Sequence, residues 1–164
     1  MTALAMPNLT ASDGTTAQAQ VGTLYNSKGV TWMYCKATAA TIAAYSACSG
    51  ATPAAMEEAT TTTATALGTA GGFACVPQFD VAASEYFWGV VECNYLSWDD
   101  STKMKVLAAN VTAGNLLYST ATDGVLDDTS AGSTIPLIGV VLTETVTTQE
   151  AADFVTFKRM SWLK

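Results

Sequence analysis

The chain has 164 residues, with seven Lys plus Arg, fourteen Asp plus Glu and no histidine, so its formal net charge is −7. Charged residues make up only 13% of it, about half their share in an ordinary soluble domain, whereas 28 residues are Ala and 26 are Thr. Without histidine, Ser-His-Asp and Cys-His catalysis and imidazole metal ligation are excluded. A single arginine, Arg159, and the acidic balance disfavour nucleic-acid binding. We therefore expect a non-enzymatic protein without cofactor, metal or nucleic-acid partner.

This length predicts one domain. No stretch approaches 18 uninterrupted apolar residues, so no membrane contact is expected, and Met1–Thr10 lacks the basic and apolar regions of a signal peptide. Cys35, Cys48, Cys75 and Cys93 form no CxxC pair, which disfavours zinc and thioredoxin-like chemistry. Buried free thiols are the simplest interpretation, and one or two disulfides remain open if the protein leaves the cell.

Residues 1–20 lack sustained periodicity and predict an extended N-terminal arm. Its apolar residues Leu4, Met6 and Leu9 could contact another surface, or the arm could be disordered. The next residues predict a hairpin, because Asn26-Ser27-Lys28-Gly29 is good turn chemistry between Thr23–Tyr25 and the β-branched and aromatic run Val30–Lys36.

The middle of the chain is harder to interpret. Residues 37–48 place their larger side chains poorly on one helical stripe, which favours extended structure. Thr52-Pro53 and Glu57-Glu58 suit a helix start, but four threonines at 60–63 oppose its continuation. We expect at most one short helical turn near residues 53–59.

The remaining chain is rich in short apolar runs. Phe73–Phe79 and Lys103–Ala108 predict strands, and Asp123-Gly124 predicts a turn. Both faces of Glu85–Tyr95 are apolar, so this strand is expected to be central or covered at an interface; Gly89 within it indicates a bulge or a close backbone approach. The sequence thus predicts an all-β fold: residues 21–164 form a single small sandwich or barrel of short antiparallel strands behind the arm.

Several blocks resemble one protein family. They are Val21–Tyr25 with Gly29–Tyr34, the strand ending Val76-Pro77, Ser84–Val91, Ala113–Asp128 and Ile138–Leu142. Together they cover roughly half of the chain and are similar to the small head decoration, or cement, proteins of tailed bacteriophages, marine-phage type. The resemblance does not extend to residues 52–70 or to the last 20 residues.

The resemblance implies a structural virion protein, made in the host cytoplasm, that binds the major capsid protein lattice on the outer capsid surface. It further implies an oligomer, commonly a trimer, and a role in stabilising the expanded head. It transfers no catalytic residue. Low charge and strands with two apolar faces agree with a subunit whose surface is covered by partners.

Three groups of candidate contact residues follow. The arm residues Leu4, Met6 and Leu9 are candidates for capsid contact. An intersubunit patch is drawn from Tyr86–Val91 and Ile135–Leu142, with Tyr86, Trp88, Val90, Ile135 and Leu137 as its candidate interface residues. Trp98 with Asp99 and Asp100, in an expected loop, is a candidate ligand contact. An alternative function follows from that loop, namely a glycan- or receptor-binding module on a phage head or fibre surface.

Three adjacent acid pairs could suggest chemistry: Glu57-Glu58, Asp99-Asp100 and Asp127-Asp128. Neighbouring residues of an extended strand point to opposite faces, so such pairs do not place two carboxyl groups on one substrate. Asp123, Asp127 and Asp128 do not follow the ligand spacing of a helix–loop–helix calcium site. We expect solvated turn residues at these positions.

Overall fold

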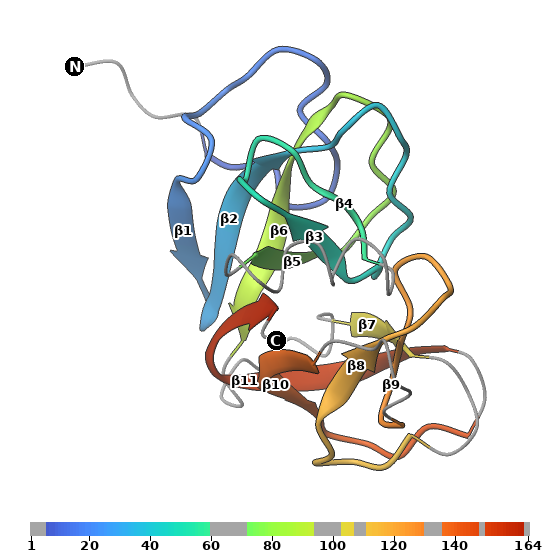
Figure 1. Cartoon of the computed structure of the whole chain (residues 1–164). Helices are drawn as coiled ribbons and strands as arrows, with labels where there is room; N and C mark the ends of the chain where they lie inside the picture. Colours follow the sequence, from blue (N-terminus) through green and yellow to red (C-terminus); the bar gives the residue numbers. More distant parts are fainter. Residues whose placement is uncertain are drawn as a thin grey trace.

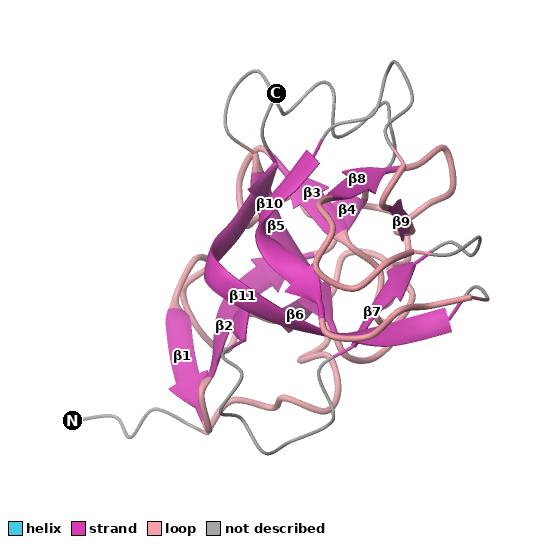
Figure 2. Ribbon diagram, turned by 90° about the horizontal axis from the view of Figure 1, so that it is seen from below, coloured by secondary structure: helices cyan, strands magenta, loops and turns pink. Residues whose placement is uncertain are grey.

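The computed structural model describes residues 6–59, 72–93, 103–106, 111–129, 136–147 and 150–162. This part of the chain contains strands and no helix (Figures 1 and 2), and hence no helix able to cross a membrane. The all-β prediction is confirmed. The strands are β1 (Leu24–Ser27), β2 (Val30–Lys36), β3 (Cys48–Gly50), β4 (Glu57–Glu58), β5 (Phe73–Pro77), β6 (Tyr86–Cys93), β7 (Lys103–Val106), β8 (Leu117–Ser119), β9 (Leu126–Asp127), β10 (Pro136–Leu142) and β11 (Glu150–Trp162).

The strands pair in the order β1-β2-β6-β5-β11-β10-β8-β9-β7, with β3 paired to β4 and β5, and with β11 also paired to β7. All these ladders are antiparallel except the short β7–β9 contact. The sheet as a whole is not closed into a barrel and is consistent with a sandwich. In Figure 1 the group β1, β2 and β6 lies above the group β7 to β11, and β5 joins the two by pairing with β6 and β11.

The first hairpin forms as the sequence predicts. Leu24 pairs with Met33 and Ser27 pairs with Val30, so Lys28 and Gly29 make a two-residue turn. Their φ values are 50° and 81°, the left-handed pair that a twisted two-residue hairpin requires.

The central strand β6 is buried on both faces, as its two apolar faces predict. Trp88 and Val90 belong to the larger core cluster, which also contains residues of the second group of strands such as Leu117 and Trp162. Phe87 and Val91 belong to a smaller cluster on the opposite face. The chain itself therefore provides the cover on both faces.

Two glycines in strands lie at close approaches. A Cβ atom added to Gly89 would lie 2.7 Å from the Sγ atom of Cys75, on the adjacent strand β5. Gly139, with φ of 91°, lies at a register shift between Ile138 and Val140 in the β10–β11 ladder. The crowding at Gly89 thus comes from a neighbouring side chain and not from the backbone approach expected there, while Gly139 marks a bulge.

Residues 52–59 contain one tight turn and no helix, within the expectation of at most one short helical turn. The amide of Ala55 donates to the carbonyl of Thr52 at 3.1 Å, which makes a single tight turn, and Glu57–Glu58 then forms β4 against Cys48 and Ser49. Side-chain contacts favour the strand, because the Glu58 Oε1 atom accepts hydrogen bonds from the Ala43 amide at 2.8 Å and from the Ser46 hydroxyl at 2.7 Å. These tertiary contacts outweigh the local helix-start signals.

Candidate functional site

Residues 6–20 contain no strand but lie against the first group of strands. The Asp13 amide donates to the Tyr86 carbonyl at 2.8 Å, and the Tyr86 amide donates to the Gly14 carbonyl at 2.9 Å. Further along, the Gln18 amide donates to the Tyr34 hydroxyl at 2.9 Å. The arm is thus attached to β6 and then crosses over β2 before it enters β1.

An aromatic row lies beneath this part of the arm. Tyr25 meets Trp88 edge to face, with ring centroids 6.0 Å apart, and Tyr34 contacts Trp88 at 4.9 Å. Tyr34 also stacks on Tyr86 at 5.8 Å, and the Lys36 Nζ atom lies 5.1 Å from the centre of the Tyr86 ring. Such ring pairs stabilise the fold by about 0.5–1.5 kcal/mol each beyond the effect of their buried area. The aromatic row therefore forms a well-fixed surface beneath the arm.

Tyr34 joins the arm to this aromatic row. Its hydroxyl accepts the hydrogen bond from the Gln18 amide and lies near the Asp13 carboxylate. Burial, and after it the nearby Asp13 carboxylate, raise the pKa of Tyr34 to about 12. The phenol is therefore protonated at neutral pH.

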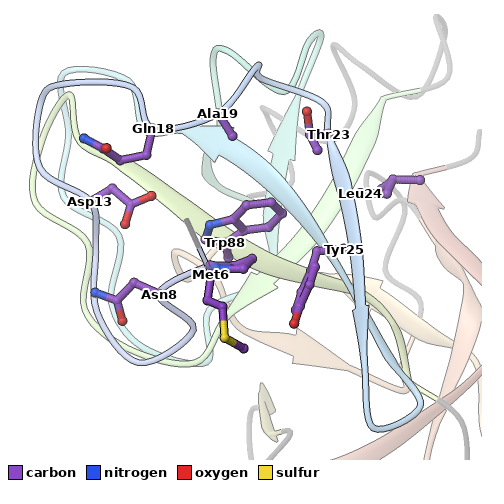
Figure 3. Close-up of a pocket in the computed structure, with 10 residues that line it drawn as sticks. Met6, Asn8, Asp13, Gln18, Ala19, Thr23, Leu24, Tyr25 and Trp88 are labelled. Carbon is purple, nitrogen blue, oxygen red and sulfur yellow. The ribbon is translucent and has the colours of Figure 1, made fainter. Parts of the chain in front are cut away.

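A cavity of about 350 Å³ lies between the arm and β1. Trp88 and Tyr25 provide aromatic lining, Met6 and Pro7 cover it from the arm, and Asp13 borders it with its carboxylate directed toward Trp88 (Figure 3). Its volume falls within the range of small-molecule sites in proteins. This cavity brings residues of the arm, β1 and β6 together in one candidate site.

The predicted arm contacts have different surroundings. Met6 is 84% exposed and lies at the cavity, whereas Leu9 packs against the larger core cluster. Leu4 lies outside the described residues. Met6 is therefore the described arm residue most available to another surface.

The predicted interface residues lie mostly inside the chain. Trp88, Val90 and Leu137 are buried in its own core, and Tyr86 is half-buried and packs against that core. Ile135 lies outside the described residues. The three buried side chains are enclosed by the chain itself and leave little surface for a partner.

The candidate ligand residues Trp98, Asp99 and Asp100 also lie outside the described residues, so the glycan- or receptor-binding alternative stays a prediction.

The surroundings of the acid pair Asp127-Asp128 are described by the structure. The Asp128 Oδ2 atom accepts from the Thr112 amide at 2.9 Å and from the Asn115 side-chain amide at 2.8 Å. Burial raises the pKa of Asp128, but these hydrogen bonds outweigh burial and lower it.

Asp128 thus fixes the loop before β8. Among the described residues, no group of three or more acidic or cysteine side chains is placed to hold a metal ion.

The four cysteines are buried and free, which confirms the interpretation as structural thiols. The Sγ atoms of Cys35 and Cys75 lie 4.0 Å apart, and Cys48 pairs with Cys75 across β3 and β5. Burial raises the pKa of the Cys35 and Cys48 thiols, so these two side chains remain protonated in the core.

The sequence interpretation missed the cavity. Its lining comes from three separate stretches, namely 6–8, 13–19 and 23–25, together with Trp88. The sequence signal for it was weak, namely apolar residues in the arm such as Met6 and the neighbouring Leu24 and Tyr25 in the first strand of the hairpin. Comparisons with protein-family models, with curated proteins and with solved structures give no match.

Proposed function

We propose that this chain is a non-enzymatic structural protein of a bacteriophage virion that binds the exterior of the capsid as a trimer and stabilises the expanded head. The sequence blocks that resemble head decoration proteins carry this proposal. In the structure, the blocks between Phe73 and Val146 supply strands β5, β6, β8, β9 and β10. The blocks that carry the resemblance thus lie on strands that pair with one another, β5 with β6 and β8 with β9 and β10.

The proposed mechanism is mechanical. Packaged DNA pushes the shell outward, and a subunit bound across neighbouring capsomers resists their separation through apolar contacts and backbone hydrogen bonds. The long β2–β6 and β10–β11 ladders suit such a load, because force along a ladder is shared among many hydrogen bonds. No titrating group is needed, and the net charge of −7 favours a position away from the DNA.

A reconstitution experiment tests the proposal. Purified chain is mixed with phage heads that lack their decoration protein, the heads are sedimented, and the temperature of head disruption is measured. We expect saturable co-sedimentation and a higher disruption temperature. Failure to co-sediment, or binding without any gain in heat resistance, would overturn the proposed function.

A pair of variants tests the contribution of the arm. Met6→Asp places a charge on a side chain that is 84% exposed, and Leu116→Asp does the same at a 39% exposed position before β8. Both variants should remain folded. We expect Met6→Asp to weaken head binding more than Leu116→Asp, and equal effects would remove the arm from the proposed capsid contact.

The trimer has its own measurement. Light scattering on the isolated chain should give three times the monomer mass at high protein concentration. A monomer throughout the concentration range would overturn the preassembled trimer while leaving capsid binding open to the sedimentation test.

A further inference from the structure

The cavity beside the arm combines a fixed aromatic lining with a fixed acid. Trp88 is 4% exposed and contacts the Tyr34 ring at 4.9 Å, while Tyr25 meets it edge to face. These contacts fix the orientation of both rings. The cavity is therefore formed before any ligand arrives, which lowers the entropic cost of binding.

Asp13 is the charged group that borders this cavity; none of the described lining residues is Lys or Arg. Its amide donates to the Tyr86 carbonyl, which fixes its backbone. A carboxylate offers about four acceptor sites, so Asp13 has capacity for a donor that enters the cavity. Figure 3 shows the Asp13 side chain directed toward Trp88, which places this capacity on the cavity side.

The cation on the neighbouring strand does not satisfy this acid. The Lys36 Nζ atom lies over the Tyr86 ring, 5.1 Å from its centre, and is not part of the lining. The cavity thus presents a negative charge and aromatic rings to whatever enters it. A cation that carries methyl or methylene groups complements both features.

We propose that this cavity binds an organic ammonium group, either of a small amine or of a lysine side chain in a peptide. The ammonium lies against the Asp13 carboxylate, and its methyl or methylene groups lie against Trp88 and Tyr25. The lining supports an ammonium more than a neutral apolar group, because a neutral ligand would leave the carboxylate facing the cavity without a partner. This inference does not depend on the proposed virion function.

The proposal is tested with three probes and the purified full-length chain. Choline represents a free amine, N-acetyl-lysine methylamide represents a peptide side chain, and 3,3-dimethylbutan-1-ol has the shape of choline without its charge. Binding is measured by calorimetry at low salt. We expect at least one cationic probe to bind about tenfold more tightly than the neutral alcohol, the ratio typical of one charge-assisted contact.

The relative affinities of the two cationic probes identify the source of the ammonium, and either preference supports the shared chemistry. If neither cationic probe binds more tightly than the neutral alcohol, the cavity is merely apolar and the proposal is overturned. Failure of both cationic probes to bind would overturn it as well. Neither result requires a variant.

Asp13→Asn supplies a second test, because asparagine has nearly the same size and shape as aspartate but no charge. We expect this variant to retain the thermal unfolding curve and to bind the cationic probe about tenfold more weakly. Asp123→Asn removes the same charge from the exposed turn between β8 and β9 and should leave binding unchanged. If the two variants bind equally well, the assigned role of Asp13 is wrong.

Discussion

Replacing Gly139 with alanine should destabilise the fold far more than the same change at Gly114. The two residues have similar backbones, with φ of 91° and 82°, so an alanine meets the same left-handed penalty of about 1–2 kcal/mol at both positions. The smaller entropy of the unfolded alanine chain offsets about 0.4–1 kcal/mol of this. Gly114→Ala should therefore cost between about 0 and 1.6 kcal/mol.

Gly139 differs in what surrounds it. An added Cβ atom would lie 2.8 Å from the Lys158 carbonyl oxygen and 2.9 Å from that of Arg159, whereas at Gly114 nothing lies within 4 Å. The crowding atoms belong to the backbone of β11, so relief requires the β10–β11 ladder to separate. Overpacking of this kind costs about 1–3 kcal/mol.

The expected difference between the two variants is thus about 2 kcal/mol, or about 4–8 °C in Tm for a chain of this size. Urea unfolding followed by tryptophan fluorescence and circular dichroism measures it, with equal m values as the check that unfolding remains comparable. Free energies of unfolding that agree within about 0.5 kcal/mol, below the expected overpacking cost, would refute the close approach of β11 at Gly139.

Two further predictions concern buried side chains. Because the folded-state pKa of Tyr34 is raised from 10.0 to about 12, its contribution to the free energy of unfolding is complete below pH 10 and is lost as the pH rises toward 12. Tyr34→Phe should therefore lose less stability than the wild type over this alkaline range. If the free energy of unfolding has the same pH dependence in both proteins, the raised pKa of Tyr34 is wrong. Because all four thiols are buried, the native protein should react slowly with a thiol reagent and the urea-unfolded protein rapidly, whereas fast labelling of the native protein would place a cysteine at the surface.

The sequence predicts local features well where one side chain type requires one backbone. Lys28-Gly29 between two β-rich runs specifies its hairpin, and the two apolar faces of β6 indicate a strand that is covered on both sides. The turn and strand at 52–59 were not predictable in this way, since Glu58 receives its hydrogen bonds from Ala43 and Ser46. A local pattern carries no information about such distant partners.

The arm illustrates the same limit. The described part of the arm is held by backbone hydrogen bonds at Asp13 and Gly14 and by the bond from the Gln18 amide to the Tyr34 hydroxyl. Such contacts require no periodic pattern of side chains, and residues 1–20 have none. Backbone donors are the same in every non-proline residue, so no composition or spacing reveals them. The cavity, which depends on where the arm crosses β2, could not be predicted for this reason.

The burial of β6 also changes where a partner should be sought. Two apolar faces on one strand indicate that something covers both, but they do not distinguish the chain itself from a second subunit. Trp88 and Val90 are enclosed by the chain's own core, so they offer a capsid or a second copy little area. Among the described residues, the exposed large hydrophobic side chains include Met6 and Leu24, and both border the cavity beside the arm. An apolar contact with a partner is therefore better placed at the arm and β1 than over β6.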